Sequence, residues 1–306
     1  MKIKSIRAFA VPAMTVISGW KDGDRDPDAR RAPWQVDAEV ANPMSRYPRY
    51  KRLRDSWRAR LDAVGVLVTA DDGSWGFGTT ILGTPTISLI NDHLGLLLEG
   101  ENAMATDKLW DMMMRIASPY SPAGLASYAI SGIDLALWDL KGRVLKAPVY
   151  EIAGGPARDG QFCYATGNDT DWHMELGFRA TKLACPYGTA DGLDGLLRNE
   201  ELVARTRELI GPEVELMLDC WMAFDVEYAV RLAERLRPHN LKWIEDCLIP
   251  EDYSSHLALR QRLPWMTLTG GELGLLEGVG LGVGLDQYAV HRAAERYRTD
   301  DRYHHV

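Results

Sequence analysis

Three acidic residues stand at the predicted ends of successive strands in the second half of the chain. Asp219 lies in the segment VELMLDCW, Glu245 in LKWIEDC and Glu272 in MTLTGGE, at spacings of 26 and 27 residues. Each spacing fits one strand plus one helix, and the carboxyl ends of parallel strands meet at one rim. Clustered carboxylates need a cation or protons to offset their repulsion, and oxygen ligands suit Mg²⁺. The pattern predicts a magnesium site, against the alternative that these are unrelated surface acids.

A lysine ends the strand before these acids. Lys182 lies in FRATKLACPYG, and we expect its side chain to point to the same rim. There it would bind a substrate carboxylate or stabilise negative charge that develops during a reaction. The alternative is a surface lysine whose alkyl stem covers apolar atoms while the ammonium stays in water.

The elements that must position these residues alternate between strand-like and helix-like patterns after residue 155. Such alternation favours a parallel sheet or barrel, and a closed (β/α)8 barrel needs eight strands. Five strands are predicted here. The strands are expected at about 161–165, 179–185, 214–220, 241–246 and 266–271, and the helices near 170–177, 194–209, 225–236 and 253–262.

The first half of the chain has a different texture, and Pro148 followed by Gly154-Gly155-Pro156 separates it from the second half. We therefore place a domain boundary near residue 150. Strands, a hairpin turn, helices and a long loop precede it. The strands are expected at 2–12 and 62–70, the turn at 71–73, the helices at about 86–98, 104–116 and 127–145, and the loop at 17–50.

Composition narrows the possible functions. The net charge is -8, which argues against general nucleic-acid binding because that needs a basic surface. No apolar run approaches the roughly 20 residues of a membrane helix, and the N-terminus lacks the apolar core of a signal peptide. Cys163, Cys185, Cys220 and Cys247 form no CxxC pair, so we expect reduced, half-buried thiols in a cytoplasmic protein.

The last segment, 273–306, departs from the strand and helix alternation. Its start, LGLLEGVGLGVGLDQ, holds five glycines, and such sequence packs poorly as strand or helix. It contains neither GxGxxG nor GxxxxGK[ST], so it does not predict a phosphate loop.

Several segments resemble a known family. The three acids and GIDLALWDLKGRVLKAPVYEIAGG at 132–155 resemble the mandelate racemase branch of the enolase superfamily. NPMSRYPRYKRLRDSW at 42–57, YATG at 164–167 and LKWIED at 241–246 are similar to its L-rhamnonate dehydratase group. The resemblance covers about residues 1–272.

The resemblance implies an α+β capping domain (1–150) and a TIM-type (β/α)7β barrel (151–272) with one Mg²⁺. It implies a hydro-lyase that removes the proton beside the carboxylate of a small sugar acid. An enediolate then loses the 3-hydroxyl as water and leaves a 2-keto-3-deoxy acid. Asp219, Glu245 and Glu272 match the metal ligands, Arg54 matches a substrate-binding arginine of the capping loop, and Lys182 matches the first lysine of a K-x-K motif.

Two departures from the family pattern bear on activity. Ala184 stands where racemising relatives have the second lysine, which favours dehydration over two-base racemisation. In the family the base is a histidine on the seventh strand, oriented by an aspartate on the sixth, and neither strand is recognisable after Glu272. We expect a frameshifted or truncated product with about five of eight strands and impaired activity.

Alternatives to an impaired dehydratase remain open. The first is a non-catalytic remnant that binds metal or a partner. The second is a dehydratase of another acid sugar, and the third is a fragment that cannot fold alone. The resemblance also implies that the intact family fold forms a homo-oligomer. No nucleic-acid or membrane partner is expected.

Overall fold

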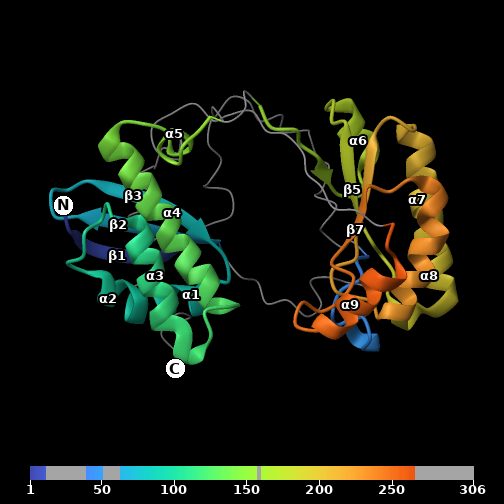
Figure 1. Cartoon of the computed structure of the whole chain (residues 1–306), viewed down its shortest axis with the longest axis horizontal. Helices are drawn as coiled ribbons and strands as arrows, with labels where there is room; N and C mark the ends of the chain where they lie inside the picture. The colour runs from blue at the N-terminus through green and yellow to red at the C-terminus, as the bar shows by residue number, and fades with distance from the viewer. Residues whose placement is uncertain (12–38, 51–62, 157–159, 266–306) are drawn as a thin grey trace. The chain divides into compact units, whose positions relative to one another are not determined.

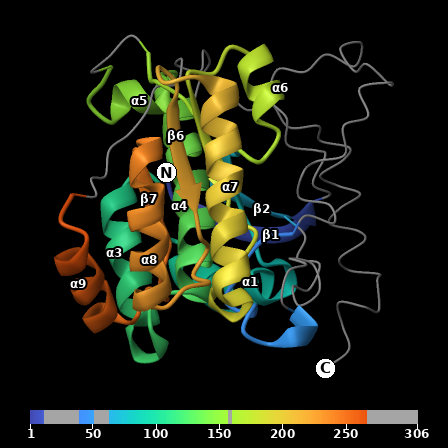
Figure 2. The ribbon, with the colours of Figure 1, turned by 90° about the vertical axis from the view of Figure 1, so that its right-hand side faces the viewer.

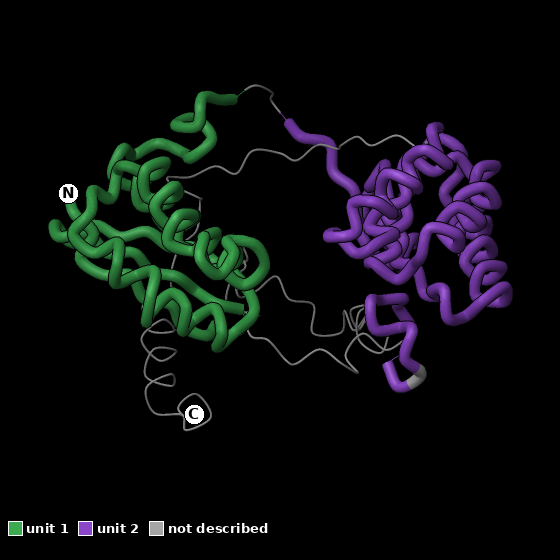
Figure 3. The backbone as a smooth tube through the Cα atoms, turned by 60° about the horizontal axis from the view of Figure 1, so that its bottom comes forward, with its two compact units in different colours: residues 1–24, 60–159, 275–306 green, residues 25–59, 160–274 purple. Residues whose placement is uncertain are grey.

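The computed structural model describes residues 1–11, 39–50, 63–156 and 160–265 (Figure 1). The chain divides into two compact units (Figure 3). The described residues of unit 1 are 1–11 and 63–156, and those of unit 2 are 39–50 and 160–265. None of the helices in these ranges is long and apolar enough to span a membrane.

Unit 1 is built on a three-stranded antiparallel sheet in the order β1-β2-β3. The strands are β1 (Ile3–Val11), β2 (Ala63–Ala70) and β3 (Trp75–Thr80). The predicted turn at 71–73 joins β2 to β3, and Gly73 takes the left-handed conformation with φ +88°. The two predicted strands are thus confirmed within a residue or so.

Helices cover one face of this sheet. They are α1 (Gly83–Leu89), the π-helical turn η3 (Ile90–Leu94), α2 (Gly95–Leu98), α3 (Thr106–Ala117) and α4 (Leu125–Leu145). The short helix α5 (Val149–Ile152) follows α4 and contacts it. The strand β3 carries glycines where α4 crosses it, because a Cβ atom at Gly76 would lie 2.1 Å from the Ala136 carbonyl oxygen. Ile6, Val66, Ile133 and Leu137 belong to the core between the two layers.

Unit 2 contains a four-stranded parallel sheet in the order β4-β5-β6-β7. Its strands are β4 (Ala165–Thr166), β5 (Ala180–Ala184), β6 (Glu215–Asp219) and β7 (Trp243–Glu245). Its helices are α6 (Thr170–Glu175), α7 (Gly192–Ile210), α8 (Val226–Leu236) and α9 (Tyr253–Arg262). This is the β/α alternation expected from the sequence; the fifth predicted strand, at 266–271, lies outside the described residues.

The helices α7 and α8 pack side by side on one face of this sheet (Figure 2). Every residue of β5 is buried, as expected for a parallel strand covered on both faces. Leu183 and Leu218 from the strands join Val203 and Leu232 from the helices in one apolar cluster. The opposite face carries a second, smaller apolar cluster of Ala180, Met217 and Trp243, and the partly exposed acids lie at the carboxyl ends of β6 and β7.

The segment 39–50 belongs to unit 2 although it precedes β2 in the chain. The Ala41 N–H donates to the Cys185 carbonyl oxygen at 2.7 Å, next to the end of β5. The Asn42 side-chain amide donates to the Val40 carbonyl oxygen, and the Asn42 backbone N–H donates to Ser45 Oγ. The short helix η1 (Pro48–Tyr50) ends the segment.

Candidate metal centre

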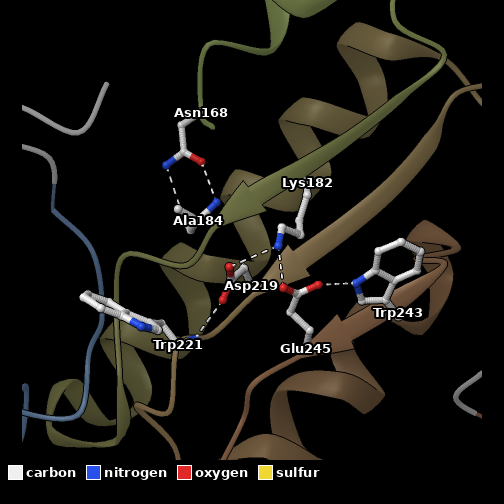
Figure 4. Close-up of polar contacts among 7 residues, drawn as sticks. All are labelled: Asn168, Lys182, Ala184, Asp219, Trp221, Trp243 and Glu245. Atoms are coloured by element: carbon white, nitrogen blue, oxygen red, sulfur yellow. Dashed lines mark hydrogen bonds and ion pairs between the residues drawn. The ribbon is translucent and has the colours of Figure 1, made fainter. Parts of the chain in front are cut away.

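Two of the three predicted acids lie side by side at the carboxyl ends of adjacent strands. Asp219 is the last residue of β6 and Glu245 the last of β7, and they are register partners. The same register pairs Ala184, the last residue of β5, with Asp219. The 26-residue spacing in the sequence therefore corresponds to neighbouring positions at one rim (Figure 4).

Lys182 joins the two acids, although it lies two residues before the end of β5. Its side chain extends along the strand, and its Nζ donates to Glu245 Oε1 and lies 3.3 Å from Asp219 Oδ2 (Figure 4). Lys182 is only 7% exposed. A buried ammonium between two carboxylates is not the surface lysine of the alternative interpretation.

The second oxygen of each carboxylate also has a donor. The Trp221 N–H donates to Asp219 Oδ1 at 3.0 Å, and Trp243 Nε1 donates to Glu245 Oε2 at 2.6 Å. Both contacts are drawn in Figure 4. Each carboxylate thus contacts the lysine through one oxygen and a neutral N–H through the other.

The environment shifts the proton affinities of these groups. Burial raises the pKa of Asp219; the positive charge of Lys182 opposes this shift, and the negative charge of Glu245 adds to it. For Lys182, burial works toward a lower pKa, but the hydrogen bond to Glu245 and the charges of Asp219 and Glu245 outweigh it. The net pKa of Lys182 is raised, so the ammonium stays protonated at neutral pH.

A further acid, which the sequence analysis did not single out, lies at the same rim. One carboxylate oxygen from each of Asp219, Glu245 and Asp246 lies within 4.8 Å of the other two. Side chains alternate along a strand, so Asp246 would point away from Glu245 if β7 continued. Instead Asp246 takes a left-handed conformation, with φ 50°. The adjacent pair of acids in the sequence was the only available signal.

The turns that follow β6 and β7 hold this rim together. Trp221 and Met222 have left-handed φ values of 39° and 62°, which non-glycine residues adopt rarely. The Met222 N–H donates to the Asp246 carbonyl oxygen, and the Phe224 N–H donates to the Cys247 carbonyl oxygen. Strained backbone of this kind concentrates at functional sites.

The end of β5 is fixed by an amide side chain. Asn168 Oδ1 accepts from the Ala184 N–H at 2.9 Å, and Asn168 Nδ2 donates to the Ala184 carbonyl at 3.1 Å (Figure 4). Ala184 thus carries only a methyl group where racemising relatives are expected to have a second lysine. The sequence analysis missed Asn168, because a single Asn in a loop has no distinctive pattern.

Two predicted site residues, Arg54 and Glu272, lie outside the described residues. Their roles as substrate and metal ligands stay predictions. All four thiols are free: Cys185, Cys220 and Cys247 are buried in the apolar cluster between the sheet and its helices, while Cys163 is partly exposed. Burial raises the pKa of Cys220, whose thiol neighbours Cys185 and Cys247. Three of the four thiols are therefore more deeply buried than the half-buried state predicted.

Comparison with protein families matches both units. Residues 54–154 match the family "Mandelate racemase / muconate lactonizing enzyme, N-terminal domain", and residues 170–274 match "Enolase C-terminal domain-like". The first match lies mostly in unit 1 and the second in unit 2.

Individual relatives agree with the family match. The chain is 41% identical over 274 residues to the L-rhamnonate dehydratase of Saccharopolyspora erythraea. The aligned region is 89% of this chain and 68% of that protein. It is similar to two crystal structures from Gibberella zeae. One is of L-rhamnonate dehydratase, with TM-score 0.77, 32% identity and coverage of 87% of this chain and 63% of that one. The other is of rhamnonate dehydratase complexed with Mg, with TM-score 0.78, 33% identity and coverage of 87% and 64%.

The chain thus spans about two thirds of the length of these relatives. A capping unit, a parallel β/α unit and matches of this extent agree with one another. The chain belongs to the mandelate racemase and muconate lactonizing enzyme family of the enolase superfamily.

Proposed function

We propose that this chain binds Mg²⁺ at Asp219 and Glu245 and uses it to bind the carboxylate of a sugar acid. The observation that carries the proposal is the pair of carboxylates at the ends of adjacent parallel strands, with a buried ammonium against both. A lysine there indicates that this position favours a cation. Asp246 offers a third oxygen within 4.8 Å. Carboxylate oxygens are the donors that Mg²⁺ prefers, so these residues fit the ion.

The reaction class we propose is dehydration of an aldonic acid of the L-rhamnonate type. Relatives named L-rhamnonate dehydratase and a related structure complexed with Mg support this choice. The proton beside the carboxylate leaves first and the 3-hydroxyl follows, for a net loss of one water, and the resulting enol becomes the 2-keto acid, so the reaction needs no oxidant or reductant. Bound Mg²⁺ would stabilise negative charge on the substrate carboxylate as that proton leaves.

The described residues would contribute as follows. Lys182, protonated and close to both acids, would place its positive charge beside the same substrate oxygens. Ala184 offers no proton acceptor at the end of β5, which favours one-way dehydration over racemisation. We further propose Glu272 as another metal ligand and Arg54 as a substrate ligand, on the family resemblance alone.

A second candidate function is binding without turnover. The sequence after Glu272 shows no recognisable counterpart of the family's Asp and His pair. His173 does not replace it, because it bonds Thr181, which alternates with Lys182 and so faces the other side of β5. In this second proposal the chain binds Mg²⁺ and an acid sugar but releases the acid unchanged.

Product formation separates the two candidates. The full chain is incubated with Mg²⁺ and a panel of aldonic acids that includes L-rhamnonate, and 2-keto-3-deoxy acids are detected by their semicarbazone absorbance. Product that disappears with EDTA and in Glu245→Gln supports the dehydratase. Mg²⁺-dependent binding of the acid without product supports the second candidate. If the chain neither binds the acid nor forms product, both candidate functions are wrong.

A further inference from the structure

Trp243 forms a hydrogen bond with Glu245 on the same strand, β7. The two residues are two positions apart on β7 and so share one face of the strand. Trp243 Nε1 donates to Glu245 Oε2 at 2.6 Å. Trp243 is 8% exposed, and its indole meets the Tyr164 ring edge-on, with 5.6 Å between ring centroids and 78° between planes. The packing of the indole therefore fixes the direction of this N–H.

The two oxygens of Glu245 consequently differ. Oε2 accepts from a neutral, buried N–H that can only donate. Oε1 contacts the Lys182 ammonium, which is a cation and lies beside Asp219 as well. A metal ion that binds at this rim competes with Lys182 for Oε1, whereas Oε2 keeps its hydrogen bond from the indole N–H. The geometry therefore presents Glu245 to a cation through one oxygen.

One-oxygen presentation discriminates between divalent cations. Mg²⁺ takes six ligands in near-ideal octahedral geometry and keeps several waters, so a carboxylate that offers one oxygen suits it. Ca²⁺ takes six to eight oxygens and readily accepts both oxygens of one carboxylate. We propose that Trp243 is a positioning residue that makes the site selective for Mg²⁺ over Ca²⁺. This inference rests on the proposed metal centre at Asp219 and Glu245.

Packing alone is the competing explanation for a tryptophan at this position. Trp243 belongs to a small apolar cluster with Ala180 and Met217, against which Phe162 and Tyr164 pack. A role limited to packing would survive replacement by another aromatic ring. The N–H would not, so a substitution that keeps the ring and removes the donor separates the two roles.

The test is calorimetric titration of the full chain with Mg²⁺ and, separately, with Ca²⁺. Trp243→Phe keeps an aromatic ring and frees Oε2. We expect about a tenfold loss of Mg²⁺ affinity, in line with the loss of a partner that orients a metal ligand. We expect Ca²⁺ affinity to stay level or rise, so the Mg²⁺ to Ca²⁺ affinity ratio falls by about tenfold or more.

A matched control is available in the same unit. Trp265 Nε1 donates to Glu234 Oε1 at 3.2 Å, which is the same chemical pair away from the rim. Trp265→Phe is expected to leave both affinities unchanged. Trp243→Leu, which keeps an apolar side chain and has no donor, is a second variant, and thermal unfolding identifies the variants that fold.

The outcomes separate this inference from the proposed function. If the wild-type chain binds Mg²⁺ and the folded Trp243 variants keep the wild-type affinity ratio, the selectivity role is wrong and the metal centre stands. If the wild-type chain binds neither cation, the proposed metal centre is wrong and the role of Trp243 is overturned with it.

Discussion

Removal of the Lys182 ammonium is the sharpest perturbation that this geometry offers. Lys182→Met keeps most of the buried stem and removes the charge that lies against Asp219 and Glu245. The carboxylate oxygens at the rim lie within 4.8 Å of one another. Two unit charges at that distance repel by about 3.5 kcal/mol at an effective dielectric constant of about 20.

Partial exposure lowers that figure. The side chains of Asp219 and Glu245 are 24% and 26% exposed, so water screens part of the repulsion. We therefore expect the free energy of unfolding of Lys182→Met to fall by about 2 kcal/mol in the absence of divalent cations. Mg²⁺ would then supply the missing positive charge. A ligand at 100 times its dissociation constant stabilises by about 2.7 kcal/mol, so Mg²⁺ at that concentration should offset the loss.

The assay is urea unfolding with and without Mg²⁺. Lys242→Met is the matched control, because Lys242 Nζ pairs with Glu215 Oε1 at 2.8 Å in the same unit, away from the rim. The stabilisation by Mg²⁺ should be larger in Lys182→Met than in the wild type or the control, since no ammonium competes for the carboxylates. Equal stabilisation in all three proteins would refute this reasoning.

Two further predictions follow from single residues. Asp246→Asn removes a charge within 4.8 Å of the other two acids, so Mg²⁺ affinity measured by calorimetry should fall roughly fivefold, and an unchanged affinity would exclude Asp246 from the site. Burial lowers the pKa of His173, whose Nδ1 lies 2.7 Å from Thr181 Oγ1. Because the unfolded state then binds the proton more tightly, the free energy of unfolding should fall as pH drops below about 6.5. His173→Gln should show a shallower fall in urea unfolding than the wild type, and equal slopes in the two proteins would contradict the prediction.

The sequence predicted the placement of the acids well, because strand and helix lengths repeat. The strands β5, β6 and β7 lie within two residues of their predicted bounds, which brought Asp219 and Glu245 to adjacent strand ends. Register then followed from parallel pairing alone. Regular periodicity thus carried this part of the prediction.

Features that depend on turns and side-chain contacts were not predictable in this way. Asp246 reaches the rim only because its backbone is left-handed, and strand alternation would have pointed it away. Lys182 was expected at the strand end, but its contact with both acids depends on how a long side chain extends from within β5. The hydrogen bond between Trp243 and Glu245 leaves no trace in spacing, because residues two apart on any strand share a face.

Titration of Mg²⁺ into the wild-type chain and Asp219→Asn tests the central claim most directly. Asp194→Asn is the control, because its carboxylate forms an exposed pair with Arg198 on α7. The proposed centre predicts one Mg²⁺ per wild-type chain, roughly tenfold or more weaker binding to Asp219→Asn, and wild-type binding to Asp194→Asn. Equal affinity of the wild type and Asp219→Asn would contradict a metal centre at the ends of β6 and β7.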